Sequence, residues 1–163
     1  MIYALIAAAL VALDQLVKYL VMTNIPFGEH VPFIPHILEL TYVKNTGAAF
    51  SIFSDHTWAL ALVSLVMSIV LALALWKNIF RHPFGKLALT LLLAGAAGNF
   101  IDRAFRGFVV DMFNVLFMNF AVFNVADICV VVGGFAAGIY YLLLWDKLEG
   151  RREDPHDGTD PDR

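Results

Sequence analysis

Seven polar or charged residues stand in otherwise apolar sequence, and they include side chains suited to acid–base chemistry. They are Asn45, Asn99, Asp102, Arg103, Asp111, Asn124 and Asp127. Asp111 lies in the run V-V-D-M-F, and Asp127 follows F-N-V-A. Two carboxyl groups held close together in apolar surroundings tend to share one proton, so that one acts as general base and the other as general acid. Such a pair activates water and titrates as a unit, which is the arrangement that an aspartic protease needs.

Several of these residues also have a purely structural interpretation. An aspartate that opens a helix, as Asp127 does here, is usually a cap. Gly95, Asn99 and Asp102 fall at i, i+4 and i+7 of one helical stripe, with Arg103 four residues after Asn99. The stripe is equally typical of a close helix contact through glycine with an interfacial Asp–Arg pair. Taken alone, the pattern leaves both interpretations open.

Asp14 and Lys18 form a second polar pair inside an apolar stretch. They stand at i and i+4 with the acid first, the favoured order for a helical ion pair. Lys18 lies about one turn from the end of its stretch, from where its side chain can snorkel to the interface. We interpret the pair as structural, with a supporting role near an active site as the alternative.

Other nucleophiles and metal ligands fit the sequence less well. The single cysteine, Cys129, excludes an intrachain disulfide and lies inside an apolar stretch, away from the histidines. A serine–lysine dyad from Ser51 and Lys44 lacks a recognisable nucleophile motif. The histidines have no metal-ligand spacing and are interpreted as ordinary loop residues. Three of the five, His30, His36 and His56, lie in the segment that follows the first apolar stretch. We therefore expect no metal and no cofactor.

The composition is that of a membrane protein. Of 163 residues, 60% are hydrophobic and 15% charged, and the mean hydropathy is +0.74. A soluble core of this size cannot hide so much apolar surface. Four stretches approach the roughly 20 apolar residues that a transmembrane helix needs. They are residues 2–22, 58–76, 87–101 with their flanks, and 128–145.

Positive charges predict the orientation of these spans, because cytoplasmic loops carry the excess of lysine and arginine. Seven lysines and arginines lie on one side of the membrane and three on the other. The seven are Lys77, Arg81, Lys86, Lys147, Arg151, Arg152 and Arg163, and the three are Lys44, Arg103 and Arg106. We therefore expect both termini in the cytoplasm. The seven polar residues then gather at the outer ends of the spans, a convergence that unrelated structural roles do not predict.

The segment between the first two predicted spans, residues 24–57, lies on the outer side in this orientation and is expected to form β-structure. Residues 37–44 are rich in β-branched and aromatic side chains, and N-T-G at 45–47 offers a turn before the apolar residues 48–53. This pattern predicts a hairpin at the membrane surface. Residues 109–123 have a similar composition, so we expect a small outer β-platform. Residues 150–163 are polar and are predicted to be a disordered tail, following a membrane domain over residues 1–149.

Five sequence blocks together resemble the lipoprotein signal peptidases, the signal peptidase II family of bacteria. The blocks are L-D-Q-L-V-K at 13–18, K-N-T-G-A-A-F at 44–50, G-N-F-I-D-R at 98–103, G-F-V-V-D-M-F at 107–113 and F-N-V-A-D at 123–127. Each block is weak alone, but five in the same order are highly specific. The resemblance covers the chain except its tail.

This resemblance implies a mainly α, integral membrane fold of four transmembrane helices with a small extracytoplasmic β-cradle. It also implies a metal-independent aspartic endopeptidase of the bacterial inner membrane, inhibited by globomycin and acting at the outer face. Its substrate would be a prolipoprotein carrying diacylglyceryl-cysteine in the membrane lipid, and cleavage would occur just before that cysteine.

The resemblance assigns roles by position. Asp111 and Asp127 become the catalytic dyad, and Asp14 and Lys18 a structural pair. The supporting residues would be Asn45, Asn99, Asp102, Arg103 and Asn124. Met112 follows Asp111 where many members have phenylalanine, so the packing beside this carboxyl is open. Cys129 matches no functional position and is interpreted as a small buried apolar residue.

Two other classes of protein compete with this interpretation. A proton-coupled transporter would spread its carboxylates along a path and use broken helices. Here the carboxylates other than Asp14 crowd at one end of the spans. A structural subunit would leave its polar face to be satisfied by a partner. The five blocks favour the peptidase over both.

Overall fold

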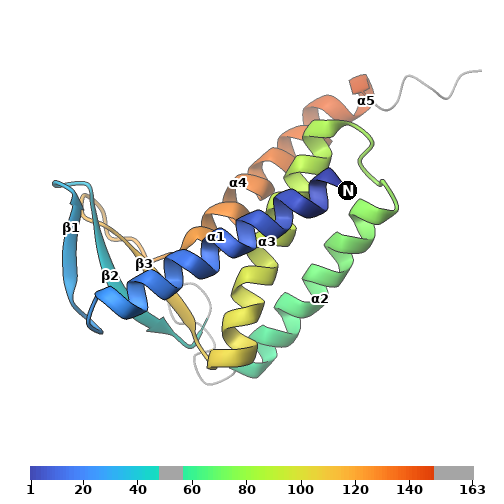
Figure 1. The fold of residues 1–163 in the computed structure, drawn as a ribbon. Coiled ribbons are helices and arrows are strands. Elements are labelled where there is room, and N and C mark those ends of the chain that lie inside the picture. The colour runs from blue at the N-terminus through green and yellow to red at the C-terminus, as the bar shows by residue number, and fades with distance from the viewer. Residues whose placement is uncertain (48–56, 149–163) are drawn as a thin grey trace, which may run out of the picture.

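Four long apolar helices dominate the computed structural model, which describes residues 1–47 and 57–148. Each is long and apolar enough to cross a membrane, and together they confirm the four predicted spans. They are α1 (Ile2–Asn24), α2 (Thr57–Trp76), α3 (Pro83–Arg106) and α4 (Val125–Ile139), the last continued by the π-helical turn η2 (Tyr140–Leu144) and the short α5 (Trp145–Leu148). The helices carry a small sheet at one end, opposite the end that holds the N-terminus and α5 (Figure 1).

The central helix is α3, which packs against α1, α2 and α4. Glycine makes the closest of these contacts possible. A Cβ at Gly95 would lie 2.4 Å from the backbone oxygen of Ala126, and one at Gly98 would lie 2.7 Å from a carboxyl oxygen of Asp14. The close helix contact predicted from the glycines of this stripe is therefore present, and it brings the start of α4 against α3.

Helices α3 and α4 begin or end three or more residues beyond their predicted limits. Helix α3 starts at Pro83 and ends at Arg106, and α4 starts at Val125. The sequence criterion stops at charged residues, whereas here the charges in the last turns of α3 have partners inside the protein. Gly107, with a φ of 77°, then ends α3 in the left-handed conformation that glycine adopts without strain.

The outer β-structure is a three-stranded antiparallel sheet in the order β1-β2-β3. Its strands are β1 (His30–Ile34), β2 (Leu38–Asn45) and β3 (Val109–Val115). The β-platform and the strand over residues 37–44 are confirmed. The strand β1 was not predicted, and β2 pairs with it and with β3, while the predicted strand at 48–53 lies outside the described residues.

The sheet rests on the end of α1. Val21 of α1 and Ile25, the residue that caps α1, form a buried cluster with Val110 and Met112 of β3. Met112, whose packing beside Asp111 the sequence left open, is fully buried in this cluster. Strand β3 is thereby held at the end of the helices, and Asp111 is held with it.

Candidate active site

A cavity of about 440 Å³ lies where β3 meets the ends of α3 and α4. Its polar lining consists of five of the seven residues singled out in the sequence, Asn45, Asn99, Arg103, Asp111 and Asp127. The apolar lining comes from Val109 of β3, from residues 120–123 before α4, and from four side chains along α4, namely Ile128, Val130, Val131 and Val132. Two carboxyl groups thus face one largely apolar chamber.

Asp111 is held in this cavity by two asparagine amides. Asn45 Nδ2 donates to Asp111 Oδ2 at 2.8 Å, and Asn124 Nδ2 donates to Asp111 Oδ1 at 2.6 Å. The side chain lies in β3 and is almost fully buried. Burial, followed by the negative charge of Asp127, raises the pKa of Asp111 to about 6, although both amides oppose the rise. At neutral pH this carboxyl is therefore close to its protonation equilibrium.

Asp127 is held by the start of α4. Asn124 is the N-cap, and its Oδ1 accepts from the backbone N–H of Asp127 at 2.9 Å. Asp127 Oδ2 accepts in return from the backbone N–H of Asn124 at 3.1 Å, which completes a capping box. Asp127 therefore contributes to a cap without being the N-cap, and the same side chain lines the cavity. The capping role therefore does not exclude the functional interpretation of this residue.

Asn99 and Asn124 connect the two carboxyl groups. Asn99 Nδ2 donates to Asp127 Oδ1 at 2.8 Å, while Asn99 Oδ1 accepts from Asn124 Nδ2 at 3.2 Å. That same Asn124 nitrogen also donates to Asp111. A continuous set of amide hydrogen bonds therefore runs from one carboxyl to the other.

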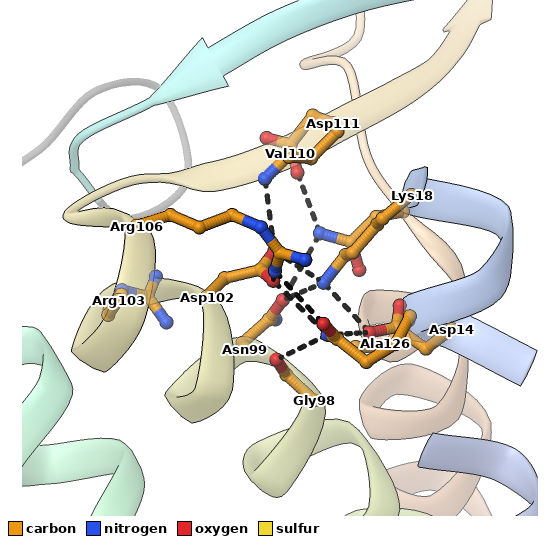
Figure 2. Close-up of polar contacts among 12 residues, drawn as sticks. Asp14, Lys18, Gly98, Asn99, Asp102, Arg103, Arg106, Val110, Asp111 and Ala126 are labelled. Carbon is orange, nitrogen blue, oxygen red and sulfur yellow. Dashed lines mark hydrogen bonds and ion pairs between the residues drawn. The ribbon is translucent and has the colours of Figure 1, made fainter. Parts of the chain in front are cut away.

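A buried ionic network supports these amides from behind, centred on Lys18 (Figure 2). Lys18 Nζ lies 2.9 Å from Asp14 Oδ2, 2.9 Å from Asp102 Oδ2 and 3.1 Å from Asn99 Oδ1. The predicted Asp14–Lys18 pair is present, but the expectation that Lys18 snorkels is wrong. Its side chain is fully buried because three oxygen acceptors inside the protein replace water.

The network also joins the helices to the sheet and to α4. Asp102 Oδ2 accepts from the backbone N–H of Val110 at 3.1 Å, and Asp14 Oδ1 accepts from that of Ala126 at 2.9 Å. These two backbone groups lie directly beside Asp111 and Asp127 in the chain. The carboxylates of the network therefore position the segments that carry the cavity carboxyls.

Two members of this network were not predicted from the sequence. Arg106 pairs with Asp102 and donates to Gln15 Oε1 at 2.9 Å, and Gln15 Nε2 donates to Asp102 Oδ1 at 3.1 Å. The predicted Asp–Arg pair of α3 thus uses Arg106 in place of Arg103. The i, i+4 spacing from Asp102 to Arg106 was the available signal.

Arg103 points away from the ionic network toward the other side of α3 (Figure 2). Its Nη1 donates to Ser64 Oγ of α2 at 3.3 Å, and its Nη2 donates to the backbone oxygen of Gly47 at 3.2 Å. Arg103 therefore connects the cavity to α2 and to Gly47, which lies just after β2.

The remaining candidates lie apart from this site or outside the described residues. Cys129 is buried in α4, in keeping with its interpretation as a small apolar residue. His30 pairs with Glu39 on the sheet, with Nδ1 and Oε1 2.5 Å apart. Ser51 and His56 lie outside the described residues. Within residues 1–47 and 57–148 no group of three or more His, Cys, Asp or Glu side chains is placed to hold a metal ion.

Comparison with known proteins identifies the family. The family model described as "Signal peptidase (SPase) II" matches residues 6–143. The chain belongs to the signal peptidase II family. It is 45% identical over 142 residues to a lipoprotein signal peptidase of Enterococcus faecalis, covering 87% of this chain and 88% of that protein. The corresponding enzyme of Streptococcus pneumoniae is 48% identical over 132 residues, covering 81% and 86%.

Solved structures support the same assignment. Two structures of a bacterial membrane enzyme superpose with TM-scores of 0.81 and 0.79, at 33% and 34% identity. The first match covers 94% of this chain and 93% of the other, and the second covers 86% and 92%. The family, the four-helix membrane fold with a small sheet and the peptidase activity expected from the sequence are confirmed. The roles of individual residues remain predictions.

Proposed function

We propose that Asp111 and Asp127 form the aspartic dyad of this signal peptidase II. The observation that carries the proposal is that both carboxyls line one cavity and are connected through the Asn124 and Asn99 amides. Since buried carboxyls with amide donors retain the ability to exchange a proton, the pair meets the chemical requirement of general acid–base hydrolysis.

Hydrolysis by this dyad needs one ionised and one protonated carboxyl. The ionised carboxyl removes a proton from water, whose oxygen attacks the scissile carbonyl carbon, while the protonated carboxyl gives its proton to the carbonyl oxygen. The tetrahedral gem-diol then collapses: the C–N bond breaks, one hydroxyl returns its proton to a carboxylate and the leaving nitrogen receives a proton from the other carboxyl. The dyad ends with one proton, as it began.

The substrate that fits this site is a prolipoprotein carrying diacylglyceryl-cysteine, cleaved just before that cysteine. A signal peptide is itself a membrane helix, so its scissile bond must be unwound and presented to water at the interface. The apolar side of the cavity along α4 offers a surface on which acyl chains can remain in contact with the bilayer. Each buried methylene contributes about 0.8 kcal/mol.

The supporting residues divide by what they touch. Asn45, Asn99 and Asn124 hold the two carboxyls through their amides, and Arg103 lies at the cavity wall. Asp102 reaches the site indirectly, through the backbone of β3 and through Lys18. The Asp14–Lys18 pair lies one step further back, as a structural element.

The test uses the purified protein and one precursor with and without diacylglycerol on its cysteine, with EDTA present. The lipidated form alone should be cleaved, and globomycin should block cleavage. Equal cleavage of both forms would refute lipid recognition. Loss of activity in EDTA that is restored by one added metal would replace the dyad with a carboxylate-bound metal.

We further propose that both termini lie in the cytoplasm of the bacterial inner membrane and that the site opens at the outer face. The distribution of seven and three basic residues supports this orientation. Reporter fusions after Lys77 and Lys147 should behave as cytoplasmic, and a fusion within residues 29–43 as external. An external C-terminus would overturn the orientation.

A further inference from the structure

The two cavity carboxyls lie in different electrostatic surroundings. Asp127 is at the third position of α4, where its Oδ2 accepts a backbone N–H of the first turn. The N-terminal end of a helix favours an anion there. Asp111 lies in a strand, where β-structure provides no comparable dipole, and its two donors are side-chain amides.

A chain of hydrogen bonds connects Lys18 to Asp127 but reaches Asp111 less directly. Lys18 Nζ donates to Asn99 Oδ1 at 3.1 Å, and Asn99 Nδ2 donates to Asp127 Oδ1 at 2.8 Å. An ammonium group has donors only, so Lys18 can form a hydrogen bond only with the oxygen end of the Asn99 amide. The nitrogen end of the amide is then directed at Asp127, where it stabilises the ionised form.

All three N–H groups of the Lys18 ammonium are used in contacts inside the protein. Its three N–H groups match three acceptors, one each on Asp14, Asp102 and Asn99. Because Asp14 and Asp102 are each tied to a backbone N–H, the position of Lys18 is fixed by α4 and β3 as well as by its own helix. The orientation of Asn99 is therefore built into the fold.

Among the residues that the structure describes, no cation donates directly to the two amides that hold Asp111. Asn45 Oδ1 accepts from the backbone N–H of Gly47 at 2.9 Å, a neutral donor. Asn124 Nδ2 divides its hydrogen bonding between Asp111 and Asn99, and its Oδ1 is used by the helix cap. Asp111 is therefore the carboxyl whose ionised form receives less support.

We propose that Lys18 is a positioning residue of the dyad, which acts through Asn99 to keep Asp127 ionised and so places the exchangeable proton of the free enzyme on Asp111. The inference rests on the proposed dyad and assigns its two roles. Asp127 takes the proton from water, and Asp111 delivers its proton to the carbonyl oxygen of the substrate.

Other charges near the dyad do not reverse this assignment. The charged groups that face it from α1 and α3 are Asp14, Lys18, Asp102, Arg103 and Arg106. Within the described residues the two carboxylates among them are paired with Lys18 or Arg106. Burial also raises the pKa of Asp111 to about 6, which agrees with a proton held there.

The first test locates the proton directly. The full chain in detergent, carrying carboxyl-labelled aspartate, is titrated from pH 4 to 8 by carbon-13 NMR as wild type, Asp111→Asn and Asp127→Asn. A carboxyl titration near pH 6 is expected in the wild type, absent from Asp111→Asn, and present at lower pH in Asp127→Asn. A titration near pH 6 that persists in Asp111→Asn and vanishes in Asp127→Asn would overturn the assignment.

The second test isolates Lys18. The double variant Asp14→Asn/Lys18→Met removes one charge of each sign and leaves Asp102 paired with Arg106, and Asp14→Asn alone is its matched control. Relative to the control, the double variant should move the acidic limb of the kcat/KM profile upward by about one pH unit. A purely structural Lys18 would reduce the amount of folded enzyme and leave the limb unmoved, which would contradict the proposal.

These outcomes are separate from those of the proposed function. Cleavage that survives Asp111→Asn or Asp127→Asn would refute the dyad itself. An inactive pair of variants with the NMR titration on the wrong residue would preserve the dyad and refute only the placement of the proton.

Discussion

Buried aspartates occur in two neighbouring regions of this protein, with opposite kinds of partner. Asp14 and Asp102 bind the cations Lys18 and Arg106. Asp111 and Asp127 bind asparagine amides and one backbone N–H, and no ion pair to either occurs among the described residues. A cation fixes a carboxylate as an anion, whereas an amide holds it in place and leaves its proton exchangeable.

The difference explains how a small membrane protein can use four aspartates for two purposes. The paired aspartates hold α1, α3, β3 and the start of α4 together. The amide-bound aspartates are placed by those same elements at the cavity. If Asp111 and Asp127 form the proposed dyad, stability and acid–base chemistry are carried by separate carboxyls, which are connected through Lys18 and Asn99.

The largest expected effect comes from removing either amide-bound carboxyl. Asp111→Asn and Asp127→Asn should each reduce kcat by at least about 100-fold with the protein still folded, because asparagine keeps the shape but cannot exchange the proton. The measurement is cleavage of a lipidated precursor by purified enzyme. Glu39→Gln on the sheet is the matched control, because it neutralises a carboxyl whose side-chain partners within residues 1–47 and 57–148 are His30 and Asn114. Near-normal turnover by Asp127→Asn would show that Asp127 is a helix-capping residue and not a catalytic one.

The cation-bound carboxyls should respond in stability. Lys18→Met leaves Asp14 without its ammonium partner and Asp102 with Arg106 alone, so we expect a loss of about 3–5 kcal/mol, typical of a broken buried ion pair. Unfolding of the detergent-solubilised protein measures it. A free energy of unfolding for Lys18→Met equal to that of the wild type would show that the ionic network does not stabilise the protein.

The contact between the two regions depends on a glycine. Gly95→Ala places a methyl group 2.4 Å from the backbone oxygen of Ala126 and should cost about 1–3 kcal/mol, because α3 and α4 must separate. Gly134→Ala on α4 is the matched control, since a Cβ there meets nothing within 4 Å. Equal stability of the two variants would show that the contact is less tight than described.

The smallest expected effect is a pH dependence confined to the amide-bound pair. Since the pKa of Asp111 is about 6, kcat/KM should fall as pH rises above about 6, when the dyad loses its shared proton. The folded state holds this proton more tightly than the unfolded state, whose value is near 3.8, so stability should also decline from about pH 4 to 6. Asp111→Asn should abolish that decline, and a decline that persists would assign it to another group.

Much of the contrast between cation-bound and amide-bound aspartates could be predicted from the sequence, because these aspartates interrupt apolar runs. Asp111 and Asp127 stood out against V-V and F-N-V-A, and Asp14 and Lys18 stood out at i, i+4. Four spans followed from hydropathy alone. Knowledge of how the family combines its five blocks supplied the assignment of roles.

Other features depend on contacts that local patterns do not encode. Lys18 bonds Asp102 across 84 positions of chain, and Gln15 bonds the same carboxyl, so neither contact leaves a periodic signal. The strand β1, H-V-P-F-I, contains proline and is fully exposed, which obscures the usual alternation. Its pairing with β2 depends on tertiary contacts, which a hydropathy pattern does not reveal.

The central claim is that Asp111 and Asp127 act together on one reacting carbon. It is tested most directly by an experimental structure of the enzyme with a lipidated peptide whose scissile bond is replaced by a hydroxyl-bearing tetrahedral mimic. The hydroxyl is expected within hydrogen-bonding distance of both carboxyls, with the acyl chains along α4. A hydroxyl that contacts neither carboxyl, or a metal ion between the carboxyls and the mimic, would contradict it.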